Sequence, residues 1–281
     1  MNFKIFHSIS YSYSEKVFFE PMVLRLTPRT DAFQRLIDFH LEIDPKPEGV
    51  SEGNDLEGCP AHYLHFSGTY DHLKIEARSS VQTLKQNPFD YILTAVECNA
   101  LPIRYPAPLA EELQPYLSRP VFSTGLQAFV DDILNDTGKD TLNFLSRLNG
   151  LIHDTFEPVK RETGHPLSAE EVFQSREGAC RDLTFLFMEI CRSVGLAARY
   201  VSGYTFADAD LVEGELHAWA EVYLPGGGWR GYDPTLGLAV ADRHIVLTTN
   251  RNSHWTLPLS GAFRSGGATA AMTYQVRVKP Y

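Results

Sequence analysis

Three residues of the types used in thiol catalysis follow one another along the second half of the chain: Cys180, His217 and Asp233. A cysteine attacks a carbonyl as its thiolate, a histidine moves the proton, and a carboxylate orients the histidine. Each residue alone has an ordinary structural explanation, namely a core cysteine, a hydrogen-bonded strand histidine and a turn-forming aspartate before proline. Their occurrence together and in this order predicts a Cys–His–Asp catalytic triad.

Cys180 directly precedes a segment with the pattern of an amphipathic helix. Apolar residues at 183, 186, 187, 190, 191 and 194 form one stripe, and Gly195 stands where a left-handed residue ends a helix. The free N–H groups and the positive end of the helix dipole favour a thiolate in the first turn. Asp182 in that turn is expected to have a structural role, and Cys191 is expected to lie in the core.

A predicted β-hairpin carries the other two residues. Residues 215–224 and 229–233 have strand character and flank the turn sequence Pro-Gly-Gly-Gly at 225–228. His217 and Asp233 would then lie near the same open end of two paired strands. Trp219 points with His217 if the strand alternates, so it either borders the cleft or packs in the core. Trp219 and Tyr204 are the candidate substrate-binding residues.

Four motifs of this region resemble the bacterial transglutaminase-like superfamily, over roughly residues 150–250. They are Gly-Ala-Cys-Arg-Asp at 178–182, the segment 195–204, His-Ala-Trp at 217–219 and Gly-Trp-Arg-Gly-Tyr-Asp-Pro-Thr at 228–235. The resemblance implies an α+β, papain-like core in which the cysteine opens a helix packed on an antiparallel sheet. It further implies thiol acyl-transfer chemistry, with Cys180 as nucleophile, His217 as general base and acid, and Asp233 as the residue that orients His217.

Residues 1–100 are predicted to form a β-rich domain resembling an antiparallel sandwich. Strand patterns occur at 3–17, 22–28, 62–68 and 73–83, while 33–43 fits either a strand or a helix. The order of these pieces is similar to the β-rich domain that precedes the core in many bacterial transglutaminase-like proteins. That family usually has Asn after the glycine that corresponds to Gly58, and here Cys59 stands there.

A proline-rich stretch near 85–108 predicts the domain boundary. The second domain, 101–281, is the transglutaminase-like catalytic core with C-terminal strands. Helical patterns occur at 111–117, 122–134 and 141–153, and a capping box at Ser168 and Glu171 opens a further helix. The strand patterns at 244–249 and 273–278 are expected to pair with a sheet.

Composition excludes several classes of partner. The net charge of −10 and the lack of a basic run argue against nucleic acid, and no stretch approaches the ~20 apolar residues of a membrane span. Four cysteines in 281 residues make no disulfide framework, and the N-terminus lacks the apolar region of a secretory signal. A cytoplasmic location is therefore expected, with a peptide or protein amide as the substrate.

Neither a metal nor another cofactor is expected. Cys59, His62 and His65 are three ligand types in one short segment, but a strand places the two histidines on opposite faces and no fourth ligand has zinc-site spacing. The acidic run Asp208, Asp210, Glu213 and Glu215 lacks the glycine and spacing of a calcium loop, so a solvated loop beside the cleft is expected.

These observations predict a thiol-dependent hydrolase or acyltransferase that acts on amide bonds through a thioester, with water as the preferred acceptor. The preference rests on the tryptophans. In animal transglutaminases a tryptophan well upstream of the cysteine donates to the oxyanion, whereas all three tryptophans here follow Cys180. The alternatives are an amine-accepting transglutaminase, a non-enzymatic binding or scaffolding module, and a zinc hydrolase. Residues 250–254 also depart from the family's usual Gly-Arg-Asp, which bears on substrate choice if this loop borders the cleft.

Overall fold

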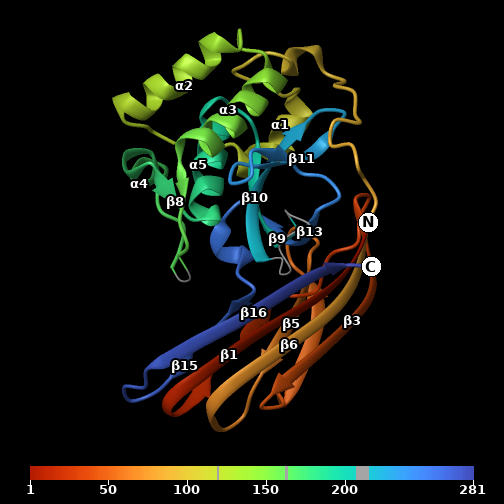
Figure 1. Ribbon diagram of the computed structural model, residues 1–281, viewed down its shortest axis with the longest axis vertical. Coiled ribbons are helices and arrows are strands. Elements are labelled where there is room, and N and C mark those ends of the chain that lie inside the picture. The colour runs from red at the N-terminus through yellow and green to blue at the C-terminus, as the bar shows by residue number, and fades with distance from the viewer. Residues whose placement is uncertain (119, 162–163, 207–214) are drawn as a thin grey trace.

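The structure is a computed structural model that describes residues 1–118, 120–161, 164–206 and 215–281. Its lower half in Figure 1 is a sandwich of long strands, and its upper half is a helical layer packed around a second set of strands. In the described part of the chain, no helix combines the length and the apolar character needed to cross a membrane.

The N-terminal sandwich consists of two antiparallel sheets. The first contains β1 (Asn2–Phe19), β6 (Thr69–Thr83) and β3 (Gln34–Asp44), and the second contains β2 (Met22–Leu24), β5 (Pro60–His65) and β4 (Gly49–Asn54). Aromatic and branched side chains between the sheets, among them Phe19, Phe66 and Ile75, are fully buried. The ambiguous segment 33–43 is therefore a strand, and the predicted β-rich domain is present.

Three C-terminal strands complete this sandwich: β14 (Leu259–Ser260), β15 (Phe263–Arg264) and β16 (Ala270–Pro280). β16 pairs with β1 from Phe3 opposite Pro280 to Tyr13 opposite Ala270, so the two termini lie side by side (Figure 1). The sequence-based division assigned these strands to the core, and that part of the prediction is wrong. Local strand character predicts a strand but carries no information about a partner strand at the other end of the chain.

The proline-rich segment that follows β6 is packed against the core. It contains one short helix, η1 (Val96–Cys98), and a fully buried Cys98. Its backbone is tied to the core by bonds from Thr94 N to the Pro225 carbonyl (3.0 Å) and from Ile103 N to the Val194 carbonyl (3.1 Å). The connection therefore fixes the sandwich and the core to each other.

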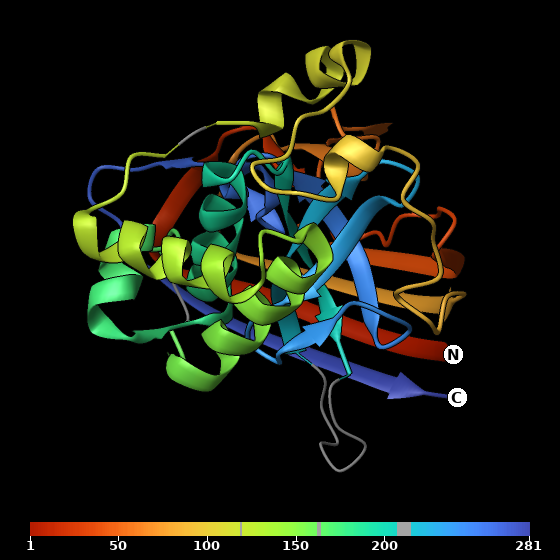
Figure 2. The same cartoon turned by 90° about the horizontal axis from the view of Figure 1, so that it is seen from above.

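The core combines a helical layer with a five-stranded antiparallel sheet (Figure 2). The helices are α1 (Ala107–Leu113), η2 (Gln114–Tyr116), α2 (Thr124–Asp136), α3 (Thr141–Thr155), α4 (Ala169–Ser175), α5 (Cys180–Ser193) and η3 (Ser253–Thr256). The sheet order is β12 (Leu238–Ala239), β11 (Gly228–Asp233), β10 (Glu215–Leu224), β9 (Ala198–Thr205) and β13 (His244–Asn250). The short strands β7 (Glu157–Pro158) and β8 (Glu177–Gly178) pair in parallel beside α5.

Local sequence signals set the ends of the helices that lead to Cys180. In α4, Ser168 Oγ accepts from Glu171 N (3.3 Å) and the Glu171 carboxylate accepts from Ser168 N (2.8 Å), which is the predicted capping box. α5 begins at Cys180 and ends before Gly195, whose φ of +83° is the left-handed conformation that favours glycine. The helix predicted after Cys180 is present.

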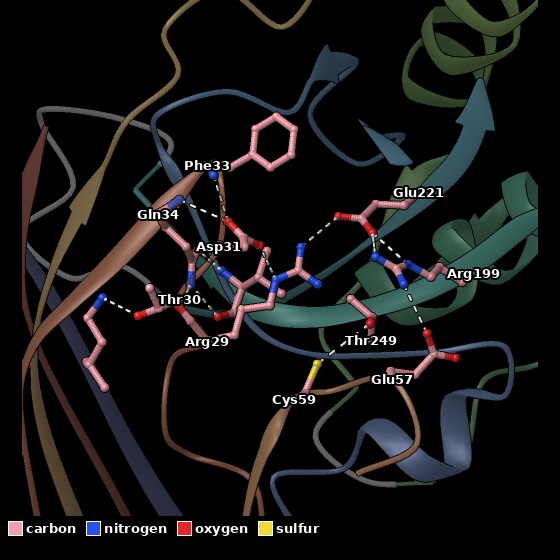
Figure 3. Close-up of polar contacts among 12 residues, drawn as sticks. Arg29, Thr30, Asp31, Phe33, Gln34, Glu57, Cys59, Arg199, Glu221 and Thr249 are labelled. Carbon is pink, nitrogen blue, oxygen red and sulfur yellow. Dashed lines mark hydrogen bonds and ion pairs between the residues drawn. The ribbon is translucent and has the colours of Figure 1, made fainter. Parts of the chain in front are cut away.

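A buried network of charged residues joins the sandwich to the core sheet. Figure 3 shows Arg29 of the sandwich and Arg199 of β9 pointing toward Glu221 of β10. Arg199 lies 2.7 Å from Glu221 and 3.0 Å from Glu57, and Arg29 lies 3.5 Å from Glu221. Burial raises the pKa of Glu221, but the charges of Arg199 and Arg29 outweigh it and hold this pKa below its ordinary value. The network keeps the two halves in one relative position because an uncompensated charge here would be costly.

Candidate active site

His217 and Asp233 meet in the interior, as the hairpin prediction requires. β10 and β11 pair from Ala220 opposite Tyr232 to Leu224 opposite Gly228, which leaves His217 and Asp233 beyond the same end of the ladder. His217 Nε2 lies 2.8 Å from Asp233 Oδ2, and both side chains are almost completely buried. The backbone N–H groups of Thr235 and Leu236 donate to Asp233 Oδ1 at 3.0 and 3.1 Å, so the carboxylate is fixed at both oxygens.

The electrostatics of this pair favour an imidazolium–carboxylate pair. Burial disfavours the charged form of the His217 ring. The charge and hydrogen bond of Asp233, together with the interaction with Cys180, outweigh this effect and raise the pKa of His217 well above 6.5. Burial likewise disfavours the charged carboxylate, and the interactions with His217 outweigh it, so the pKa of Asp233 lies well below its ordinary value. Each group therefore stabilises the charge on the other.

Cys180 is the first residue of α5, and its side chain interacts with the His217 ring. It is partly exposed, whereas Cys59, Cys98 and Cys191 are buried, and all four are free thiols. His217 Nδ1 has no hydrogen-bond partner of ordinary geometry among the described residues, so it is the nitrogen left for the sulfur of Cys180. The structure thus brings together the three residues that the sequence singled out.

Asp182 fixes the start of α5. Its buried carboxylate accepts from Ala179 N at 2.8 Å, which caps the helix, and from Leu167 N at 2.8 Å. Arg161 forms an ion pair with the same carboxylate. The structural role expected for Asp182 is confirmed, because these contacts tie Arg161 and Leu167 to the first turn of α5.

Two further residues of the site were not identified from the sequence. His244, the first residue of β13, has its Nε2 3.0 Å from Asp233 Oδ2, the oxygen that His217 also contacts. Tyr200 of β9 lies near the thiol, and burial followed by the charge of Cys180 raises its pKa well above its ordinary value. His244 gave no local signal beyond its place at the start of a predicted strand.

The two candidate substrate-binding residues are interior residues instead. Trp219 is fully buried. Its ring forms a T-shaped pair with that of His244 (centroids 5.1 Å apart), and a Cβ at Gly203 would come within 2.6 Å of it. Tyr204 is 1% exposed and bonds through its hydroxyl to His7 Nδ1 of the sandwich at 2.9 Å. Both have a packing role, because strand alternation predicts that side chains share a face but not whether that face is covered.

The cysteine and histidines at 59–65 do not converge. His62 is buried and stacks on Phe39, whereas His65 is exposed on the other face of β5, and Cys59 Sγ lies 3.7 Å from Thr249 Oγ1 at the interface (Figure 3). In the chain as described, no three potential ligands gather into a metal site. Of the acidic run, Asp208, Asp210 and Glu213 lie outside the described residues, while Glu215 Oε1 is 3.9 Å from His217 Nδ1.

An exposed aromatic cluster adjoins the anchor of α5. The rings of His165 and His254 are 5.3 Å apart, and those of His254 and Trp255 are 5.5 Å apart. Arg161, which pairs with Asp182, also donates to the His165 carbonyl at 2.9 Å. Residues 253–256 form η3, so the segment whose sequence departs from the family pattern lies beside the residues that position Cys180.

Comparison with known proteins agrees with this architecture. The model of the bacterial transglutaminase-like N-terminal region matches residues 3–82, and that of the transglutaminase-like superfamily matches residues 127–234. An uncharacterized protein of Mycobacterium tuberculosis is 28% identical over 293 residues, covering 99% of this chain and 93% of that protein. One of Mycobacterium leprae is 26% identical over 274 residues, covering 95% and 94%.

The same fold occurs in a solved structure from Cytophaga hutchinsonii, a provisionally assigned cysteine protease. The two superpose with a TM-score of 0.71 at 19% identity, over 100% of this chain and 91% of that one. The α+β fold, with its N-terminal β-rich region and its core of helices on an antiparallel sheet, is thus the transglutaminase-like one. The chain belongs to the transglutaminase-like superfamily.

Proposed function

We propose that this protein is a thiol-dependent hydrolase of amide or peptide bonds, with Cys180 as the nucleophile. The observation that carries the proposal is the position of His217, which bonds to the buried carboxylate of Asp233 through one ring nitrogen and leaves the other for Cys180. This is the nucleophile–base–orienter arrangement of covalent acyl-transfer catalysis.

In the proposed reaction, the Cys180 thiolate attacks the carbonyl carbon of the amide. His217, as imidazolium, gives its proton to the leaving nitrogen, the C–N bond breaks, and a thioester to Cys180 remains. Water then attacks the thioester while His217 accepts a proton from it, the C–S bond breaks, and a carboxylic acid leaves, which restores the Cys180 thiolate and the His217 imidazolium. Asp233 keeps the ring oriented and stabilises its charged form in both steps.

The backbone N–H of Cys180 is the first candidate to stabilise the oxyanion of the tetrahedral intermediate. It is the first residue of α5, where N–H groups have no partner within the helix, and the dipole of that helix end favours negative charge. Tyr200, whose pKa is raised by burial and by the charge of Cys180, is the candidate for a second donor. Water is the preferred acceptor, because all three tryptophans follow Cys180 in sequence.

A peptide or protein is the proposed substrate, and the provisional assignment of the Cytophaga hutchinsonii structure as a cysteine protease supports that class. The four free thiols support a reducing compartment such as the cytoplasm as the place of action. The substrate class and the compartment are both part of the proposal and go beyond membership of the superfamily.

The direct test measures cleavage of a defined mixture of peptides, and ammonia release from glutamine peptides, by the wild type and by Cys180→Ala. We expect turnover that Cys180→Ala abolishes and a chelator does not affect, together with a covalent acyl-enzyme detected by intact mass after acid quenching. Turnover that persists in Cys180→Ala would contradict the proposal, and inhibition by the chelator alone would favour a metal-dependent hydrolase.

A further inference from the structure

Asp233 accepts hydrogen bonds from two imidazoles at a single oxygen. His217 Nε2 lies 2.8 Å and His244 Nε2 lies 3.0 Å from Asp233 Oδ2, and the His244 side chain is 3% exposed. With the carboxylate ionised, each Nε2 donates to it, so the neutral form of His244 presents a lone pair at Nδ1. A carboxylate oxygen shared by two donors interacts less strongly with each than an oxygen that serves one.

His244 is held from the sandwich as well as from the core. On the core side its ring packs against Trp219. On the sandwich side, the buried Gln34 brackets Val246 on the same strand: Gln34 Oε1 accepts from Val246 N at 2.7 Å, and Gln34 Nε2 donates to the Val246 carbonyl at 2.9 Å. Thr83 Oγ1 donates to the Asp242 carbonyl at 2.8 Å, just before β13. Side chains of β3 and β6 therefore fix the strand that begins with His244.

A small cavity lies beside His244, between the sandwich and the core sheet. It has a volume of about 50 Å³, and Gln34 and Arg29 of the sandwich line it together with His244 and Glu221 of the core. His244 Nδ1 is buried and has no hydrogen-bond partner among the described residues. The ring is thus oriented by its contact with Asp233 and by its packing, and within the described part of the chain its ring nitrogens have no other hydrogen-bond partner.

We propose that the N-terminal sandwich, through Gln34 and strand β13, positions His244 as a second hydrogen-bond donor to Asp233 and thereby sets the strength of the Asp233–His217 pair. His244 is a positioning residue in this scheme, since it acts on His217 through Asp233. The inference rests on the proposed function for its catalytic meaning, but the structural coupling it states can be measured without any substrate.

Removal of the second donor has a defined electrostatic consequence. Asp233 stays in place because Thr235 and Leu236 hold its other oxygen, so its full charge then acts on His217. The titratable groups that face the pair from the described elements are Cys180 of α5, Glu215 of β10 and His244 of β13. His153 of α3 bonds to the Thr235 carbonyl in the adjoining turn, and these other groups remain unchanged when His244 is replaced.

The test is a nuclear magnetic resonance titration of the His217 ring in the full chain, with the signal assigned by its loss in His217→Gln. In His244→Leu we expect the titration midpoint of His217 to rise by about one pH unit, and in His244→Gln, which retains an N–H donor, to return toward the wild-type value. Gln34→Leu should raise the midpoint in the same direction by a smaller amount. The double variant Gln34→Leu/His244→Leu should equal His244→Leu, because Gln34 acts only through His244.

The matched control is His7→Phe, which removes another buried hydrogen bond between sandwich and core, that to Tyr204 of β9, and should leave the His217 midpoint unchanged. An unchanged or lowered midpoint in His244→Leu would overturn the proposal, as would shifts from Gln34→Leu and His244→Leu that simply add. If His244→Leu does not fold, the His217 midpoints of Gln34→Leu and His7→Phe are compared instead. A midpoint raised only in Gln34→Leu supports the proposal, and equal midpoints in the two variants overturn it. Because no turnover is measured, failure here is distinct from failure of the proposed hydrolase activity.

Discussion

Arg199 of β9 and Glu221 of β10 form an ion pair, with 2.7 Å between Nη2 and Oε2, inside the sheet that carries His217. Both side chains are less than a tenth exposed, and Glu57 of the sandwich and the ring of Trp229 complete the surroundings of Arg199. The pair therefore joins two strands of the site to the domain that precedes it.

Replacement of one partner of this pair should destabilise the fold strongly. Arg199→Met would remove the positive charge that pairs with the carboxylates of Glu221 and Glu57. We therefore expect the free energy of unfolding to fall by about 3–5 kcal/mol. The control is Arg147→Met, since the pair of Arg147 with Asp136 is 3.7 Å long and half exposed, and its loss should cost at most about 1 kcal/mol. Equal midpoints of chemical denaturation for the two variants would contradict this prediction.

Asp182 should matter for the stability of the fold, because it anchors the first turn of α5, where Cys180 stands. Asp182→Ala removes the acceptor for Ala179 N and Leu167 N and the partner of Arg161, so we expect a loss of about 3 kcal/mol or more in the free energy of unfolding. Asp140→Ala removes only the exposed N-cap bond of α3 to Asn143 N and should cost about 1 kcal/mol. A similar small effect at both positions, measured by denaturation, would show that Asp182 does not anchor α5.

The ion pair of His217 and Asp233 should stabilise the fold most within a limited window of pH. The pKa of Asp233 is lowered by folding, so its contribution is present above its unfolded value near ~4 and is lost as pH falls further. The pKa of His217 is raised by folding, so its contribution is present below its unfolded value near ~6.5 and is lost as pH rises through the folded one. The stability difference between wild type and Asp233→Asn should be greatest between about pH 4 and 6.5, and a difference independent of pH would be evidence against the pair.

The exposed aromatic cluster predicts a substrate contact. Trp255 is 53% exposed and its ring lies 5.5 Å from that of His254, next to the residues that anchor α5. Trp255→Ala should raise KM for peptide substrates by roughly 5–30-fold with little change in kcat, because it removes binding common to the ground and transition states. Tyr274→Ala, an equally exposed aromatic residue on β16, is the control and should leave both constants unchanged. An unaltered KM in Trp255→Ala would place the substrate elsewhere.

Much of the fold followed from local patterns in the sequence. The stripe from 183 to 194 and Gly195 fixed the expectation for α5, and the glycine-rich turn at 225–228 fixed the hairpin that holds His217 and Asp233. These features are encoded within one element or between sequential neighbours, so periodicity and turn chemistry are sufficient to predict them.

The errors concern contacts between distant segments. β16 was grouped with the core because it follows the core along the chain, and strand propensity is the same whichever sheet receives the strand. His244 was missed because a single histidine at a strand start has no local signature, and its function depends on the arrangement of β11 and β13. Trp219 and Tyr204 were candidate substrate contacts, with core packing left open for Trp219, because strand alternation alone does not show whether a face of the sheet is covered; both are buried.

The central claim is that His217 activates the thiol of Cys180. The most direct measurement is the rate at which iodoacetamide alkylates Cys180 at neutral pH, followed by the mass of the peptide that contains it, in wild type and in His217→Ala. We expect wild-type Cys180 to react at least about tenfold faster than it does in His217→Ala, while the buried Cys59, Cys98 and Cys191 stay unlabelled in both folded proteins. Equal alkylation rates for Cys180 in the two proteins would contradict it.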